Sequence, residues 1–232
     1  MNEGSILVVD DDREIVRSIA IHLEKEGYSV LCAYNGLEAL DMVMSQPVCL
    51  IIIDVMMPKM DGLSAIMKIR EKRNLPIIVL SAKSEDTDKI LGLSMGADDY
   101  VTKPFSPSEL VARVDAVYRR VAQFTRAAEP NFSEELRSGR FVLNLRNRSF
   151  TKDGNPVELT QVEFQIMEYF FSNPGTALDR SAILKHVWGE SYYGEEKIVD
   201  VNIRRLRMKV EEEPSNPRHI VTVWGLGYRW DE

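Results

Sequence analysis

The segment that most constrains the fold is residues 50–53, four apolar residues (Leu-Ile-Ile-Ile) that lead directly into an acid, Asp54. An uninterrupted apolar run of this length is typical of a strand buried on both faces in the middle of a parallel sheet. Pro58 follows shortly after the acid and prevents a helix from starting at once. Because ligands of open α/β sheets bind at the carboxyl ends of the strands, Asp54 is a candidate structural cap, metal ligand or nucleophile.

Similar apolar runs alternate with helical patterns throughout the N-terminal half. We expect strands at residues 6–9, 29–33, 50–53, 76–80 and 100–102, and helices at residues 13–26, 37–44, 62–70, 86–93 and 107–121. Five strands that alternate with five helices predict an α/β fold with a doubly wound, five-stranded parallel sheet.

The pattern changes after residue 122. Residues 123–135 lose their periodicity and include Ala127-Ala128-Glu129-Pro130, which is typical of a linker. We therefore expect one domain at residues 1–122, a linker at residues 123–135 and a second domain at residues 136–232.

The second domain has the pattern of a small α+β fold. Residues 141–145, 148–152 and 157–159 are typical of short antiparallel strands joined by tight turns. Thr160-x-x-Glu163 is a capping box that opens a helix to residue 172, and Asp179 caps a second helix to about residue 188. A third helix at residues 195–210 and a hairpin at residues 220–230 complete the pattern of a winged helix-turn-helix.

Composition favours a cytoplasmic protein that does not enter a membrane. The chain has 232 residues, and no apolar run approaches the length that spans a bilayer. Its first residues lack the basic and apolar segments of a signal peptide, and Cys32 and Cys49 are too few for a disulfide framework. The net charge is −7, yet residues 197–209 carry five bases and one acid. That local excess of +4 matters more for phosphate contacts than the total does.

Three carboxylates are predicted at one edge of the parallel sheet. Asp10, Asp11 and Asp54 all fall at carboxyl ends of strands, and the first and third strands are neighbours in the usual doubly wound order. Carboxylates crowded in this way repel one another unless a cation lies between them, and oxygen ligands suit Mg²⁺. The Asp10–Asp12 triplet alone is equally well explained as a helix N-terminus, where acids are favourable. Asp54 on a separate strand favours the metal site.

Two further polar residues end strands at the same edge. Ser81 ends the fourth strand and Lys103 the fifth. A hydroxyl and an ammonium there could hold two oxygens of a phosphoryl group on Asp54. Ser81 alone is more often a helix cap, whereas a Lys that ends a buried strand is seldom only a solvated charge.

The motifs VVDDD, IIIDVMMPKMDG, VLSAK and GADDYVTKPF, in this order, resemble the receiver domain of two-component response regulators over residues 4–122. The resemblance implies a flavodoxin-like fold whose Asp54 is phosphorylated by a partner sensor histidine kinase. It also implies that Asp10, Asp11, Asp54 and the backbone carbonyl of Met56 hold Mg²⁺. Lys103 would contact the phosphoryl group. The domain would have no catalytic residues in the usual sense, only Mg²⁺-dependent self-phosphorylation and self-dephosphorylation.

The same resemblance implies a switch and a dimer face. Ser81, Ala82 and Tyr100 fill the switch positions, and the Lys103–Pro104 bond is expected to be cis. Phosphorylation would draw Ser81 inward and leave space for the Tyr100 ring. The dimer face lies on the fourth helix, fifth strand and fifth helix. Its implied pairs between subunits are Lys89–Glu109, Asp99–Arg113 and Asp98–Arg120.

The third helix of the second domain is amphipathic with a basic face. Its wheel places Val199, Ile203, Leu206 and Val210 on the core side, and Lys197, Val201, Arg204, Arg205 and Met208 broadly opposite, with Asn202, Arg207 and Lys209 on the flanks. An outward Val201 could meet a thymine methyl group. Arg204 or Arg205 is the expected base contact, because Arg can bridge two acceptors on guanine, and Arg207 and Lys197 are expected on phosphates.

Residues 138–231 resemble the winged-helix effector domain of the OmpR/PhoB family through LTQVEFQIMEYF, VWGE, VDVNIRRLRMKVE and TVWGLGYRW. The resemblance implies that Trp188 and Thr222 approach phosphates and that the hairpin enters the minor groove, near Tyr228. Asn202 occupies a position that varies among members and so bears on site preference. Trp224 stands where many members carry an Arg, so it would pack or stack instead.

The leading hypothesis is a phosphorylation-switched transcription regulator that binds direct-repeat half-sites in double-stranded DNA as a homodimer, with RNA polymerase as a candidate partner. One alternative is an aspartyl-phosphate phosphatase with Asp54 as nucleophile. Such enzymes usually carry an Asp-x-Asp pair, and Asp54-Val55-Met56 lacks the second acid. Another alternative is DNA binding that does not depend on phosphorylation. No Gly-rich nucleotide loop is present, which argues against ATP hydrolysis.

Overall fold

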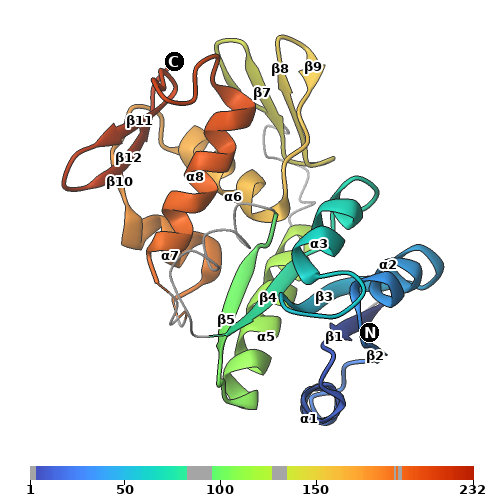
Figure 1. The fold of residues 1–232 in the computed structure, drawn as a ribbon. Coiled ribbons are helices and arrows are strands. Elements are labelled where there is room, and N and C mark those ends of the chain that lie inside the picture. The colour runs from blue at the N-terminus through green and yellow to red at the C-terminus, as the bar shows by residue number, and fades with distance from the viewer. Residues whose placement is uncertain (1–3, 83–95, 127–134, 191, 193–194) are drawn as a thin grey trace. The chain divides into compact units, whose positions relative to one another are not determined.

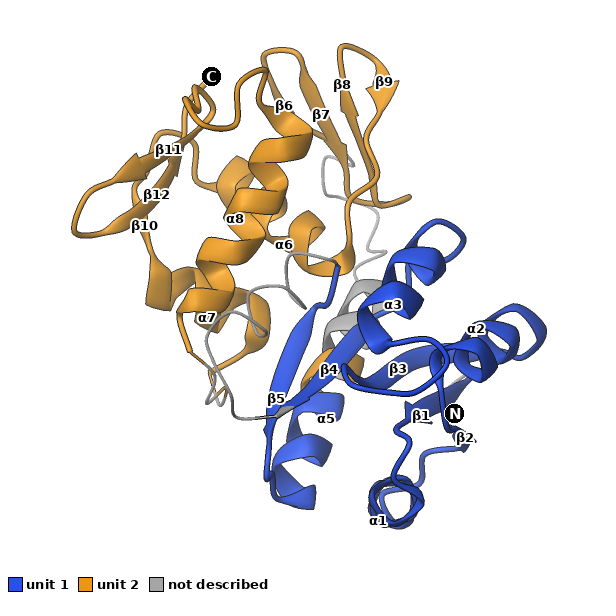
Figure 2. Ribbon diagram, viewed as in Figure 1, with its two compact units in different colours: residues 1–115 blue, residues 116–232 orange. Residues whose placement is uncertain are grey.

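A computed structural model of the chain describes residues 4–82, 96–126, 135–190, 192 and 195–232. The chain divides into two compact units, residues 1–115 and residues 116–232, with the boundary inside one long helix (Figure 2). Among the described residues, no helix is both long enough and apolar enough to cross a membrane.

The first unit is built on the predicted parallel sheet. Its strand order is β2-β1-β3-β4-β5, and all four pairings are parallel (Figure 1). The strands are β1 (Ser5–Val9), β2 (Val30–Ala33), β3 (Val48–Asp54), β4 (Ile77–Ala82) and β5 (Asp99–Lys103). The apolar residues of β1, β3 and β4 are almost completely buried, as expected for central strands covered on both faces.

Helices cover the sheet from both sides. They are α1 (Arg13–Lys25), α2 (Gly36–Ser45), α3 (Gly62–Arg70) and α5 (Pro107–Arg126). α2 and α3 contact each other (Figure 1), whereas residues of α1 and α5 line a shared pocket. The helix expected at residues 86–93 lies outside the described residues.

The second unit has two small antiparallel sheets. One has the order β6-β7-β8-β9, from β6 (Glu135–Ser138), β7 (Phe141–Asn144), β8 (Ser149–Lys152) and β9 (Asn155–Pro156). The other has the order β10-β12-β11, from β10 (Leu178–Asp179), β11 (Ile220–Val223) and β12 (Gly227–Trp230).

The sequence prediction missed two strands in this unit, β6 and the two-residue β10, and misplaced another. β6 has no buried position, so it lacks the apolar alternation that marks a strand. The strand expected at residues 157–159 was wrong, because the last ladder pair is Thr151 with Pro156. Beyond it the chain turns toward the helix that Thr160 caps, and the carbonyl of Glu158 accepts a hydrogen bond from Lys209 at 2.8 Å.

Three helices form the body of the second unit: α6 (Gln161–Ser172), α7 (Arg180–Trp188) and α8 (Lys197–Val210). Both predicted helix starts are confirmed. Thr160 and Glu163 form the capping box of α6, and Asp179 accepts the Ala182 N–H at the start of α7. The apolar faces of the helices meet the buried side of the sheets, where the Trp230 ring packs against Phe141 and Phe171.

A single buried carboxylate holds the segment between α8 and β11. Glu211 accepts hydrogen bonds from three successive backbone N–H groups, those of Arg218, His219 and Ile220, at 2.9, 2.9 and 2.7 Å. These groups precede or begin β11, so Glu211 fixes where the C-terminal hairpin starts.

We expect Glu211→Ala to lower the free energy of unfolding of the second unit by about 3 kcal/mol, because three backbone donors lose a charged acceptor. Glu213→Ala is the matched control, since Glu213 is exposed, and it should change stability by less than about 0.5 kcal/mol. All three tryptophans lie in the second unit, so denaturant unfolding followed by tryptophan fluorescence reports on that unit directly. Equal stability of the two variants would contradict the assigned role of Glu211.

Candidate functional site

The predicted carboxylate cluster is present at the carboxyl edge of the parallel sheet. Asp10 follows β1 and Asp54 ends β3, and these strands are neighbours. Asp10, Asp11 and Asp54 each place one carboxylate oxygen within 4.8 Å of the others. Asp10 and Asp54 are buried and Asp11 is exposed, so the cluster opens to solvent on one side.

The acidic triplet begins α1, as the helix N-terminus interpretation predicted, and the metal-site interpretation stays a prediction. Asp12 is the N-cap of α1 and accepts the backbone N–H groups of Glu14 and Ile15. Asp10 accepts the Asp12 N–H at 3.0 Å, which orients the turn between the strand and the helix. Asp10 and Asp11 are thereby left facing Asp54.

Lys103 is the cation nearest to the cluster among the described residues. Its Nζ lies 2.6 Å from Asp10 Oδ2 and 2.6 Å from Asp54 Oδ1. Burial alone would lower the pKa of this ammonium group, but the hydrogen bonds to the two carboxylates outweigh burial and raise it. Lys103 therefore carries its charge at neutral pH and offsets part of the repulsion between Asp10 and Asp54.

The pKa of the Asp54 carboxyl lies above its usual value even though Lys103 is its ion-pair partner. Burial is the largest influence and raises the pKa of the carboxyl, whereas the hydrogen bond with Lys103 and its charge lower it, and the Asp10 charge raises it further. The second oxygen, Oδ2, accepts the backbone N–H of Met56 at 2.9 Å. The carboxylate is thus fixed at both oxygens, one by the next turn of the chain and one by Lys103.

The loop after Asp54 is held by close backbone packing at Gly62. Its N–H donates to the Val55 carbonyl at 2.9 Å. A Cβ at position 62 would lie 2.0 Å from the carbonyl oxygen of Asp54, so only glycine allows α3 to start this close to the end of β3. The Met56 side chain points into solvent, which leaves its main chain as the part of the residue nearest the site.

These residues fit a divalent cation. Three carboxylates within 4.8 Å, one of them exposed, supply hard oxygen ligands and leave room for water, as Mg²⁺ requires. Asp10, Asp11 and Asp54 are the side chains that would hold the ion. The Lys103 charge balances only part of the cluster charge.

The other switch positions lie on the neighbouring strands. Ser81 pairs with Thr102 and Ala82 with Lys103 in the β4–β5 register, which brings Ser81 to the same edge as Asp54. Ser81 is buried, and the side chain of Ala82 lies outside the described part of the chain. Tyr100 is also buried here. The Lys103–Pro104 bond is cis, as expected.

The charges expected on the dimer face form ion pairs within one chain, as far as the structure describes them. Arg113 contacts Asp99 at 3.1 Å and Glu109 at 2.9 Å. The Asp98 carboxylate accepts hydrogen bonds from the Arg70 guanidinium at 2.7 Å and from the Ile77 N–H at 2.9 Å. Lys89 and the side chain of Arg120 lie outside what the structure describes.

The sequence prediction missed Arg70. This residue at the end of α3 also donates to the carbonyls of Gly96 and Leu75, so it ties α3 to the segments before β4 and β5. Its position in the last turn of a helix is a common place for a solvated base, and no sequence signal distinguished it from one.

The predicted core face of α8 is confirmed, but one expected outward residue is not. Val199, Ile203, Leu206 and Val210 are buried. Val201 is only 6% exposed and Asn202 is fully buried, with its side-chain amide bonded to the Ile198 carbonyl at 2.8 Å. The prediction that Val201 faces outward was therefore wrong, because the buried stripe is wider than the wheel suggested.

The two candidate base contacts on α8 differ in their partners. Arg204 is exposed. Arg205 is mostly buried beside Glu163, with its NH2 group 3.0 Å from Oε1, and it also contacts Asn202 at 3.3 Å. Lys209 binds the other oxygen of Glu163 at 2.7 Å, so this fully buried carboxylate holds two bases of α8.

Four more residues expected at the DNA have partners or are buried inside the second unit. Arg207 donates to the Ile220 carbonyl and to Thr222 Oγ1 at 2.9 Å, linking α8 to β11. Tyr228 is buried and donates to Asp200 at 2.7 Å, and Arg180 binds the same carboxylate oxygen. Trp188 is buried in the core, and its expected approach to a phosphate stays a prediction. Lys197 is half-exposed at the start of α8.

Comparison with known proteins assigns the chain to a family. Residues 6–115 match the family described as "Response regulator receiver domain", and residues 154–230 match "Transcriptional regulatory protein, C terminal". The uncharacterized transcriptional regulatory protein YcbL of Bacillus subtilis (strain 168) is 40% identical over 226 residues, which is 97% of this chain and 100% of that protein. The chain is a response regulator of the OmpR/PhoB type.

Solved structures agree with this assignment. The response regulator DrrB, described as a Thermotoga maritima OmpR/PhoB homologue, matches with 28% identity and a TM-score of 0.52, covering 100% of both chains. A mutant of RitR matches with 25% identity and a TM-score of 0.77, covering 99% of both chains. The response regulator therefore combines a receiver fold with a winged-helix DNA-binding domain in the order that the sequence predicted.

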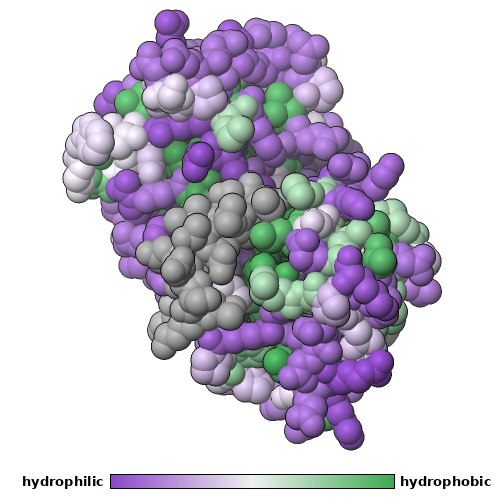
Figure 3. All heavy atoms as spheres, in the orientation of Figure 1, coloured by the Kyte–Doolittle hydropathy of each residue, from purple (hydrophilic) through white to green (hydrophobic). Residues whose placement is uncertain are grey.

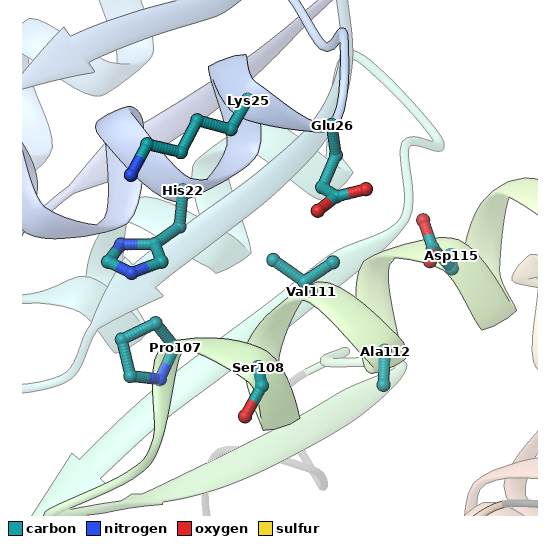
Figure 4. Close-up of a pocket in the computed structure, with 8 residues that line it drawn as sticks. All are labelled: His22, Lys25, Glu26, Pro107, Ser108, Val111, Ala112 and Asp115. Carbon is teal, nitrogen blue, oxygen red and sulfur yellow. The ribbon is translucent and has the colours of Figure 1, made fainter.

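The response regulator also has a surface pocket whose lining does not include the Asp10, Asp11 and Asp54 cluster. It has a volume of about 370 Å³ and lies between α1 and α5 (Figure 4). Its lining consists of His22, Lys25, Glu26, Pro107, Ser108, Val111, Ala112 and Asp115. Basic and acidic groups are mixed around one branched apolar side chain, so the lining favours no single charge of ligand.

The alkaline stability of the DNA-binding domain should depend on Tyr228. Burial, followed by the hydrogen bond to Asp200, raises the pKa of this phenol to about 12. The unfolded chain then loses its proton first, so the stabilisation is complete below about pH 10 and disappears as the pH rises toward 12. We expect the stability difference between wild type and Tyr228→Phe to fall by about 2 kcal/mol between about pH 9 and pH 12.

Denaturant titrations of both proteins at several pH values measure this difference, and the remaining tyrosines cancel because both proteins contain them. A difference that stays constant with pH would contradict the assigned coupling between Tyr228 and Asp200.

Proposed function

We propose that this response regulator is switched by phosphorylation of Asp54 by a partner sensor histidine kinase. The phosphorylated protein then dimerises through α5, β5 and the segment before β5, and binds repeated half-sites in double-stranded DNA to regulate transcription. The kinase, the DNA and, at a promoter, RNA polymerase would meet it in the cytoplasm.

The observation that carries the proposal is the contact of Lys103 with both Asp54 and Asp10 at 2.6 Å. The Lys103 ammonium group can leave Asp54 Oδ1 and bind an oxygen of a phosphoryl group attached there. The opposite oxygen of Asp54 is held by the Met56 N–H, so the carboxylate is oriented for attack.

The carboxylate cluster supports a requirement for Mg²⁺. Asp10, Asp11 and Asp54 would hold the ion together with the backbone carbonyl of Met56. When bound, Mg²⁺ would neutralise negative charge on the carboxylates and on the phosphoryl oxygens. The protein itself supplies the nucleophile and its orientation, and Lys103 supplies a second positive charge.

Phosphorylation would change the partners of the switch residues. The new group brings oxygens that accept hydrogen bonds from Ser81 and the backbone of Ala82, and it competes for Lys103. A shift of β4 and β5 toward the phosphoryl group would also displace Tyr100 and the neighbouring Asp98 and Asp99. On the dimer face, Asp99 and Arg113 would then pair between subunits and no longer within one chain. Two further pairs, Lys89–Glu109 and Asp98–Arg120, would also form between subunits.

The DNA contacts would come from α8 and the hairpin. Arg204 is exposed and is the better placed of the two base contacts, whereas Arg205 would first have to leave Glu163. Lys197 and Thr222 would lie near phosphates, with Asn202 adjusting site preference through Arg205. Arg207, Trp188 and Tyr228 would act mainly by positioning α8 and the hairpin.

The two alternatives have weaker support. Aspartyl-phosphate phosphatases usually carry a second acid two residues after the nucleophile, and Met56 occupies that position with its side chain in solvent. Binding of DNA without phosphorylation would make the acid cluster unnecessary. Yet Asp10, Asp11, Asp54 and Lys103 are brought together from three separate strands.

Replacing Asp54 by Asn tests the proposal. With Mg²⁺ and a small acyl-phosphate donor, the wild-type protein should shift toward dimer by at least about tenfold in its dissociation constant, and Asp54→Asn should not shift. Sedimentation velocity measures the change.

Asp61→Asn is the matched control, because Asp61 is an exposed helix cap of α3 outside the cluster. This variant should dimerise as the wild type does. Equal dimerisation of wild type and Asp54→Asn under donor would rule out Asp54 as the switch.

A further inference from the structure

Trp224 is the most exposed large apolar side chain among the described residues, with 92% of its surface accessible. The two other tryptophans, Trp188 and Trp230, are only 2% and 1% exposed and belong to the core. Leu226, two residues further, is 43% exposed. Figure 3 shows this end of the β11–β12 hairpin as pale spheres beside the purple, hydrophilic surface of the same unit.

The turn that carries Trp224 is tightly specified. The Leu226 N–H donates to the Val223 carbonyl at 3.0 Å, which closes a four-residue turn with Trp224 and Gly225 at its corners. Gly225 has a φ of +77°, a conformation that favours glycine. A Cβ on Gly227 would lie 2.2 Å from the Leu178 carbonyl, so the hairpin is also packed closely against β10. The indole is therefore presented on a short and ordered turn.

The hairpin is linked to α8 by side chains from both of its strands. Arg207 of α8 binds the Ile220 carbonyl and Thr222 of β11. Tyr228 of β12 donates to Asp200 of α8 at 2.7 Å. These links fix the hairpin against α8, the helix that also carries the exposed base Arg204.

The hairpin tip has no charge of its own. Residues 223–227 are Val-Trp-Gly-Leu-Gly, so the tip cannot form an ion pair with a phosphate. What it offers is a flat, mostly apolar ring with a flanking apolar side chain. The minor groove of DNA has apolar sugar walls, and side chains inserted between base steps unstack and bend the duplex.

We propose that Trp224 inserts its ring into the minor groove of the bound duplex and selects sites whose base steps deform easily. This inference rests on the proposed DNA-binding function and adds a specificity residue to it. The contact is apolar, so it displaces no counterion from the backbone. Recognition at this point depends on the shape and deformability of the duplex, and not on charge.

The test uses the full-length protein treated with Mg²⁺ and an acyl-phosphate donor. A random-sequence duplex pool is first enriched for binders, and the enriched duplex is then the probe. Acrylamide quenching of tryptophan fluorescence is measured with and without saturating duplex. In the free protein the quencher should reach Trp224 alone, because Trp188 and Trp230 are buried. Saturating duplex should protect this quenchable fraction.

Three substitutions at residue 224 separate an apolar contact from a charged one. Trp224→Ala should weaken binding by roughly tenfold without changing the slope of log K against log salt. Trp224→Phe retains an aromatic ring and should bind within about threefold of wild type, with no quenchable fraction in either state. Trp224→Arg should steepen the salt slope by about one unit, and the pool that it enriches should differ from the wild-type pool.

Thermal unfolding provides the control for structure, since an exposed side chain should not affect the midpoint. Arg204→Ala is the matched charge variant and should make the salt slope shallower by about one unit.

A Trp224 that remains fully quenchable in saturating duplex overturns the inference, as does a Trp224→Ala variant that binds and enriches the same duplexes as wild type. In both cases the proposed function still stands. Failure to enrich any duplex contradicts the proposed function itself, and the inference with it.

Discussion

The contact between one ammonium group and two buried carboxylates determines how the receiver domain is organised. Lys103 reaches Asp10 and Asp54 from a third strand, so three strand ends are held together by charge at one edge of the sheet. Without a cation between them, two buried carboxylates at this separation would repel and favour protonation. Asp54 is oriented by Lys103 and by the Met56 N–H. A change in the charge of Asp54 must therefore alter the contacts of Lys103, which ends β5.

The same principle applies at the other functional faces, where charged groups expected to bind a partner are neutralised within the chain. Asp98 binds Arg70, and Arg113 binds Asp99 and Glu109. In the second unit, Glu163 holds Arg205 and Lys209. In the proposed function, dimerisation and DNA binding would exchange one set of ion pairs for another. The net gain of each exchange would then be smaller than the number of new contacts suggests.

Sequence alone predicted the features that depend on local patterns or on motifs. Buried strands, helix caps such as Thr160 and Asp179, the cis bond before Pro104 and the cluster around Asp54 all have short-range or motif signals. Contacts between distant side chains were not predictable. The helical wheel could not show that Val201 packs inward, because burial depends on what covers the helix. The contacts of Arg70 with Asp98 and of Tyr228 with Asp200 join residues that are far apart in the sequence, so no local pattern indicated them.

The most direct test of the central claim is to locate the phosphoryl group by mass spectrometry after incubation with a small acyl-phosphate donor. We predict one phosphoryl group per chain, on the peptide that contains Asp54, dependent on Mg²⁺ and absent from Asp54→Asn. A phosphoryl group on a different residue, or equal incorporation into Asp54→Asn, would contradict the account of this edge of the sheet.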